Sequence, residues 1–182
     1  NTKPADNQSW NSAAGSIRYN WDALEAGEVL SKVFNVQHPD YGALGDDDND
    51  DTEEIQAAID AAEAVNGKVI IPEGTYKITA PLTVQANIKI EGNNRMGTII
   101  KKYGNFIGIA CTSAPDFENF ILDSDEGVDA SVGIHMTTTS GDRVRMKGVY
   151  VWRQGSHGVQ QDSGNLYSYI NCRFRANGGD GL

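Results

Sequence analysis

The residues best suited to binding a ligand form a cluster of aromatic and basic side chains around residue 150. The four candidate binding residues are Tyr150, Trp152, Arg153 and His157. Three further basic residues precede them, namely Arg143, Arg145 and Lys147. Flat aromatic rings pack against sugar faces, and cations bind carboxylates. We therefore expect the four candidates to bind an acidic sugar chain; the alternative is an ordinary outward surface or a subunit contact.

A run of carboxylates is the second feature that could carry chemistry. Seven of the 25 acidic residues lie in residues 46–54, with no basic residue among them. The alternating aspartates of residues 46–50 match three positions of an EF-hand calcium loop. However, Asp51 stands where that loop requires glycine, and Ala57 stands where it expects glutamate. We interpret the run as a turn and a helix start and expect no metal site or cofactor, with calcium as the unproven alternative.

Catalytic motifs are harder to find, and the catalytic residues stay unknown. The stretch Gly155-Ser156-His157-Gly158 is similar to the Gly-His-Gly element of polygalacturonases. Those enzymes also need Asn-Thr-Asp and Asp-Asp elements, which supply the paired carboxylates of glycoside hydrolysis. Neither element occurs upstream of His157 in the repeat region, and no Gly-x-Ser-x-Gly elbow occurs anywhere. The stretch is therefore better explained as a turn that leads into Val159.

Composition excludes two classes of partner. The formal net charge is −10, but outside the carboxylate run 18 acidic residues face 15 basic ones, a net charge of −3. Nucleic-acid binding needs a basic face, so we expect none. No stretch approaches the roughly 20 apolar residues of a membrane-spanning helix, so we expect no membrane insertion. Cys111 and Cys172 lie in alternating apolar patterns and are predicted to be small buried residues.

Two repeats indicate how the chain folds. The first pairs glycine with an aliphatic residue at Gly108-Ile109, Gly133-Ile134, Gly158-Val159 and Gly181-Leu182. The second aligns Asn119-Phe120-x-Leu122, Gly148-Val149-x-Val151 and Asn171-Cys172-x-Phe174. Repeats of 20–30 residues form stacked units, in which equivalent side chains make ladders about 4.8 Å apart. The sequence thus predicts an all-β solenoid, with Tyr150 and Trp152 facing outward on a strand whose Val149 and Val151 face inward.

The segment between Asp40 and Tyr76 supports the same fold. Its matching elements are Asp40-Tyr41-Gly42-Ala43, Gly45-Asp46, Asp50-Asp51-Thr52, Ile55-Gln56, Ala58-Ile59 and Ile71-Pro72-x-Gly74-Thr75-Tyr76. Together they resemble the opening segment of the pectate-lyase-like superfamily, although Asp47 replaces a glycine that is frequent there. The resemblance implies a right-handed, single-stranded parallel β-helix whose N-terminal end is covered by a helix.

That capping helix can be placed by its local signals. Asp51 or Thr52 can cap its start, and an Asp51 cap would find Glu54 at the capping-box position. One narrow apolar face consists of Ile55, Ala58, Ile59 and Ala62. The pair Asn66-Gly67 is a stop signal. Further strands are predicted at Val69–Ile71, Tyr76–Ile78, Leu82–Val84, Ile88–Ile90 and Thr98–Lys101.

We expect residues 1–30 to form a flexible lead and a helical attachment or oligomerisation segment, and residues 31–182 to form the N-terminal part of a longer parallel β-helix. Trp10 and Trp21 lie on one apolar stripe, which packs either on the body of the domain or on sibling chains. The pattern of Ile17–Glu25 resembles attachment segments that precede phage tail-protein domains.

These features predict a phage tailspike- or tail-fibre-like virion component, extracellular and homotrimeric, that recognises cell-surface polysaccharide. The first alternative is a polysaccharide lyase or glycoside hydrolase acting on acidic glycans, with its catalytic residues mostly beyond this segment. The second is a structural module that connects a spike to its baseplate and binds no glycan. The fold does not decide among these functions, because one solenoid can host many activities.

Overall fold

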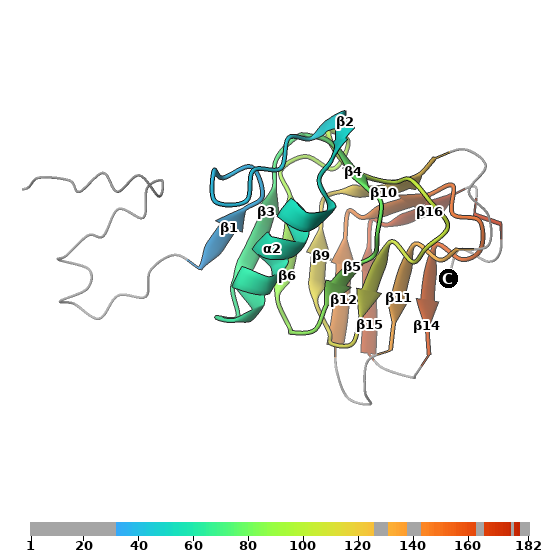
Figure 1. The fold of residues 1–182 in the computed structure, drawn as a ribbon. Helices are drawn as coiled ribbons and strands as arrows, with labels where there is room; N and C mark the ends of the chain where they lie inside the picture. Colours follow the sequence, from blue (N-terminus) through green and yellow to red (C-terminus); the bar gives the residue numbers. More distant parts are fainter. Residues whose placement is uncertain (1–31, 126–130, 138–142, 163–165, 176, 179–182) are drawn as a thin grey trace, which may run out of the picture.

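The computed structural model describes residues 32–125, 131–137, 143–162, 166–175 and 177–178. In these ranges the chain winds into a solenoid with three parallel sheets, which we name A, B and C (Figure 1). The chain passes through the sheets in the order A, B, C, except that its first coil has no strand in sheet C, and every described strand pairs in parallel with its equivalents in the neighbouring coils. This confirms the predicted right-handed parallel β-helix. No helix in these ranges has the length and apolar character needed to cross a membrane.

Sheets A and B have six strands each, and sheet C has four. Sheet A contains, in order, β1 Val33–Asn35, β3 Lys68–Ile71, β6 Lys89–Gly92, β9 Asp116–Glu118, β12 Arg143–Lys147 and β15 Leu166–Ile170. Sheet B contains β2 Asp46–Asp50, β4 Gly74–Ile78, β7 Thr98–Lys102, β10 Ile121–Ser124, β13 Tyr150–Trp152 and β16 Arg173–Arg175. Sheet C contains β5 Leu82–Val84, β8 Ile109–Cys111, β11 Ile134–Met136 and β14 Val159–Gln161.

Both predicted repeats are ladders in the structure. Ile134 pairs with Ile109 on one side and with Val159 on the other. The aliphatic residues of the first series therefore occupy equivalent positions at the starts of neighbouring sheet C strands. The glycines are required because a Cβ on Gly133 would lie 2.5 Å from the carbonyl oxygen of Gly158. The Gly181-Leu182 pair of this series lies outside the described residues.

The second series marks the sharp corner between sheets A and B. Asn119, Gly148 and Asn171 adopt left-handed backbone angles, with φ of 58°, 65° and 53°. Asparagine and glycine tolerate this conformation best, which explains their recurrence. After the corner, Val151 pairs with Leu122 and with Phe174. The corner therefore directs sheets A and B onto different faces of the solenoid.

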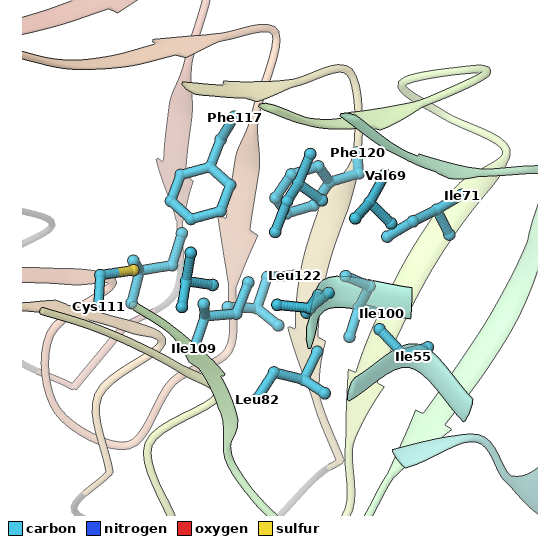
Figure 2. Close-up of a cluster of buried hydrophobic side chains, with 14 of the residues drawn as sticks. Ile55, Val69, Ile71, Leu82, Ile100, Ile109, Cys111, Phe117, Phe120 and Leu122 are labelled. Atoms are coloured by element: carbon cyan, nitrogen blue, oxygen red, sulfur yellow. The ribbon is translucent and has the colours of Figure 1, made fainter. Parts of the chain in front are cut away.

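Apolar side chains from all three sheets fill the interior. Ile55 of the helix reaches the same cluster as core residues of the strands (Figure 2). The labelled members from the strands and turns are Val69, Ile71, Leu82, Ile100, Ile109, Cys111, Phe117, Phe120 and Leu122. Cys111 is buried as predicted, whereas Cys172 is half-buried. Both are free thiols.

Helix α2, Thr52–Glu63, occupies the position that a sheet C strand would take in the first coil (Figure 1). Its predicted apolar face is buried against the core. The amide of Gln56 accepts a hydrogen bond from the Thr83 backbone N–H at 2.8 Å and donates one to the Thr83 carbonyl at 3.1 Å. The helix therefore bonds to the free edge of β5 as a neighbouring strand would, which agrees with the predicted capping role.

One detail of the capping prediction is wrong. Asp51 precedes the first helical residue, but its carboxylate makes no capping hydrogen bond to the helix. It instead accepts the backbone N–H groups of Leu44 at 2.6 Å and Gly45 at 3.0 Å. Tertiary contact thus outcompetes the capping box, because the incoming loop brings two unpaired N–H groups to this buried carboxylate. The predicted stop signal is confirmed, since α2 ends before Asn66 and Gly67 donates its N–H back to the Ala62 carbonyl.

Candidate functional site

The outer face of sheet B positions the aromatic candidates. Val149 and Val151 are fully buried, whereas Tyr150 and Trp152 lie half-buried on the outside of β13, as the strand alternation predicts. Their ring centroids are 5.7 Å apart, with the ring planes tilted by 31°. The two side chains thus form one continuous aromatic surface that solvent can reach.

Tyr150 lies between two arginine side chains. The guanidinium carbon of Arg95 is 5.0 Å from the centroid of the Tyr150 ring, and that of Arg173 is 5.6 Å from it. Both distances are typical of cation–π interactions, which orient the guanidinium groups beside the ring. Arg173 comes from the neighbouring strand β16, where it pairs with Tyr150, and Arg95 comes from the turn after β6. We name Tyr150, Trp152, Arg95 and Arg173 the sheet B site.

Sequence reasoning missed both of these arginines. Arg173 could have been found, because the second repeat series places it two residues after Asn171, as Tyr150 is placed two residues after Gly148. Arg95 gave no such signal, since it lies in a longer turn outside the repeat pattern.

Arg153 belongs to the same face but is already engaged. Its Nε lies 2.8 Å from Asp123 Oδ1, and a terminal nitrogen lies 2.5 Å from Asp123 Oδ2. Such a two-point interaction holds the guanidinium plane in place. Asp123 is only 7% exposed, so it needs this cation as a partner. Arg153 therefore holds the corner after β13 in position.

A second cationic and aromatic group lies on the N-terminal part of the same face. The Nζ atoms of Lys77 and Lys101 lie 5.2 Å and 4.7 Å from the centroid of the Tyr103 ring. Asp47 accepts a hydrogen bond from the Tyr103 hydroxyl and forms an ion pair with Lys101, both at 3.0 Å. Because Lys101 on β7 and the sheet B site share one sheet, cations and rings follow this face along the solenoid axis.

The other predicted residues lie apart from the sheet B site. His157 lies in the turn that leads into sheet C, and its Nδ1 is 2.9 Å from the Ser156 hydroxyl. Arg145 and Lys147 lie on β12 of sheet A, before the corner at Gly148. They form ion pairs with carboxylates on β9, at 3.9 Å and 2.5 Å. The seven residues that are close in sequence therefore divide among three faces.

The first five residues of the carboxylate run form the irregular strand β2 and not the turn that the sequence predicted, and their side chains make hydrogen bonds within this region. Asp46 accepts the backbone N–H groups of Asp48 and Asn49, and the hydrogen bonds from Asn49 lower the pKa of Asp46. Asp50 accepts hydrogen bonds from the hydroxyls of Thr52 and Thr79 at 2.5 Å each. Within the described ranges, no three His, Cys, Asp or Glu side chains come together as metal ligands. The EF-hand-like spacing therefore does not bring its oxygens to one point.

One cation lies in the interior. Lys102 at the end of β7 is fully buried, and its Nζ donates hydrogen bonds to the Phe106 carbonyl at 2.9 Å and to the Ser131 hydroxyl. No carboxylate in the described part of the chain forms an ion pair with it. Burial disfavours the charged form and lowers the pKa of Lys102 to about 8. The residue is closed off from solvent and does not contribute to the sheet B site.

The solenoid and its turn pattern define a pectate-lyase-like parallel β-helix protein. More specifically, the chain belongs to the family described as rhamnogalacturonase A/epimerase, pectate lyase-like, whose model matches residues 33–182. A stretch of 76 residues is 45% identical to mannuronan C5-epimerase AlgE3 of Azotobacter vinelandii. That stretch covers 37% of this chain and 4% of the relative.

Solved structures resemble the chain over a larger part. The A-module of mannuronan C-5 epimerase AlgE6 from Azotobacter vinelandii superposes with a TM-score of 0.68 at 27% identity, over 80% of this chain and 48% of that one. ORF18 of Geobacillus virus E2 has a TM-score of 0.53 at 18% identity, over 83% of this chain and 44% of that one, and shows the fold alone. The chain thus spans less than half the length of each of these proteins.

Proposed function

We propose that this chain binds an acidic polysaccharide along the outer face of sheet B. The observation that carries the proposal is the Tyr150 ring, which lies between the guanidinium groups of Arg95 and Arg173 and beside Trp152. A uronate unit has an apolar ring face and a carboxylate. The aromatic surface can pack under the sugar ring while an arginine pairs with its carboxylate.

The similarity to mannuronan C5-epimerases supports this class of ligand, because mannuronan is a polymer of uronate units. The arrangement of the face supports a polymer over a single sugar. Tyr103 with its two lysines repeats the same combination of ring and cation further along the sheet. An extended chain parallel to the solenoid axis could contact both groups.

The proposal is tested by titrating the protein with a hexamer of mannuronate and, in parallel, with the uncharged hexamer of mannose. We expect the charged hexamer to bind and the Trp152→Ala variant to lose about tenfold or more in affinity, since stacked aromatic residues dominate such contacts. Lys68→Gln on sheet A is the matched control and should bind as the wild type does. Equal affinity of the wild type and Trp152→Ala would refute the sheet B site.

We further propose that the binding face serves a tailspike- or tail-fibre-like virion component, homotrimeric and extracellular. An elongated repetitive body suits a spike in which three solenoids pack side by side. The pattern at Ile17–Glu25 also favours this role; it lies outside the described residues.

The second candidate function is an enzyme that acts on a uronate polymer, either a polysaccharide lyase or a glycoside hydrolase. The 76-residue segment that is 45% identical to a mannuronan C5-epimerase favours it. The same titration distinguishes the two functions. Unsaturated ends released from the mannuronate hexamer by the longer natural protein would indicate a lyase, whereas binding without chemical change supports recognition alone.

A further inference from the structure

A polar groove runs along sheet A, on a different face from the sheet B site. It consists of two depressions of about 490 Å³ and 340 Å³, and both are lined by Arg143. Each volume falls in the range of about 300–1,000 Å³ that is usual for ligand sites. The lining residues used below are Asn66, Asn87, Lys89, Asp116, Arg143 and Arg145.

The groove follows the solenoid axis. Its lining residues come from the starts of strands β3, β6, β9, β12 and β15 or from the turns just before them, and these strands are consecutive neighbours in sheet A. With strands about 4.8 Å apart, four steps give a length of roughly 19 Å. A groove of this shape suits an extended chain better than a compact small molecule.

The charges on this face single out Arg143. Basic side chains on neighbouring strands of sheet A are matched with carboxylates at 2.5–3.9 Å. The pairs are Lys68 with Glu91, Lys89 with Glu91 and Glu118, Lys147 with Glu118, and Arg145 with Asp116. Arg143 is exposed, and within the described ranges no carboxylate lies at ion-pair distance from it.

We propose that this groove is a second binding site for an acidic polysaccharide, with Arg143 pairing with a carboxylate of the chain. A guanidinium that pairs with no carboxylate of the described residues, and that lies where two depressions meet, can bind a carboxylate of the ligand through two hydrogen bonds. The amides of Asn66 and Asn87 line the N-terminal part of the groove, and amide groups suit sugar hydroxyls. The inference rests on the proposed function for its class of ligand but concerns other residues.

Two sites on two faces would let one chain of this protein hold two polysaccharide strands, or two segments of one strand. The ion pairs on neighbouring strands of sheet A determine whether the groove prefers a charged or an uncharged glycan. Because Glu91, Glu118 and Asp116 are already paired, they add little net repulsion, and Arg143 supplies the local excess of positive charge. An uncharged glycan would leave Arg143 without a carboxylate and should bind more weakly.

The test is a calorimetric titration with the mannuronate hexamer, using the wild type, Arg143→Gln, Trp152→Ala and Lys68→Gln. We expect two hexamers per chain in the wild type and in Lys68→Gln, which removes an ion-paired charge of the same sheet that lines neither depression. Arg143→Gln should weaken one of the two sites about tenfold. Because the Arg143 side chain is exposed and pairs with no carboxylate of the described residues, the melting temperature of this variant should equal that of the wild type.

The outcomes separate this inference from the proposed function. The groove is not a binding site if Arg143→Gln binds two hexamers with unchanged affinity. The same conclusion follows if the wild type binds a single hexamer and only Trp152→Ala weakens that binding. If only Arg143→Gln weakens binding, the groove stands and the sheet B site is refuted. If the wild type binds no mannuronate hexamer at all, both assignments of an acidic glycan are wrong.

Discussion

The buried Lys102 leads to a prediction about how the stability of the protein depends on pH. Its ammonium group is fully buried, hydrogen-bonded only to the Phe106 carbonyl and the Ser131 hydroxyl, and paired with no carboxylate of the described residues. Replacing Lys102 with methionine keeps an unbranched side chain, one atom shorter, and removes the charge. We therefore expect the difference in the free energy of unfolding between Lys102→Met and the wild type to change with pH.

The sign and size follow from the pKa of Lys102. Burial lowers this pKa from 10.5 to about 8 in the folded state. Below pH 8 both states carry the charge, so the wild type bears the whole cost of burying it. Above pH 8 the unfolded state binds more protons than the folded state, and the free energy of unfolding of the wild type rises with pH. By pH 10 this gain amounts to about 2 to 3 kcal/mol.

Other buried groups act in the opposite direction, so the difference between two proteins has to be measured. Burial raises the pKa values of Cys111 and Tyr76, which lowers the stability of the folded state as the pH rises through about 9 to 10. These groups are present in both proteins, and their contributions cancel in the difference. What remains is the titration of Lys102.

The assay is urea-induced unfolding, followed by circular dichroism, at pH 7, 8, 9 and 10. The free energy of unfolding of Lys102→Met minus that of the wild type should be about 2 to 3 kcal/mol lower at pH 10 than at pH 7. Lys101→Met is the matched control, because Lys101 is outward-facing, pairs with Asp47 and has a raised pKa. The difference in the free energy of unfolding between Lys101→Met and the wild type should stay nearly constant from pH 7 to pH 10. A constant difference for Lys102→Met would show that Lys102 is not a desolvated, unpaired cation, and would refute the reasoning.

Two further predictions concern the coil ladder and the subunit arrangement. Gly133→Ala should lower the free energy of unfolding by about 2 kcal/mol or more, because the new Cβ would lie 2.5 Å from the Gly158 carbonyl oxygen. Gly97→Ala would meet only the exposed side chain of Glu73, at 3.1 Å, and should change the free energy of unfolding by less than about 0.5 kcal/mol; equal effects of the two substitutions would contradict the ladder. Light scattering should give a trimer for the wild type and a monomer for the Trp10→Ser/Trp21→Ser variant; a monomeric wild type would argue against the spike.

The repeating part of the fold could be predicted from sequence because its determinants are local and periodic. Each coil has to place an aliphatic residue inward at the same level, and only glycine fits where backbones approach closely. The series through Gly108 and Gly133 and the series through Leu122 and Val151 therefore recur with the spacing of one coil. The capping helix was predictable for the same reason, since its apolar face and its stop signal are contained in one short segment.

Which residues come together in each site depends on how the coils stack. Tyr150 and Trp152 face outward by strand alternation, which the sequence by itself determines. Only the tertiary structure decides that Arg95 and Arg173 come to lie beside Tyr150, because stacking joins residues about one or two coils apart in the chain. The tight corner after sheet A likewise separates Lys147 from Tyr150, although only three positions divide them. Charge and aromatic character can be read from the residues, but which of them share a face is set by the winding of the backbone.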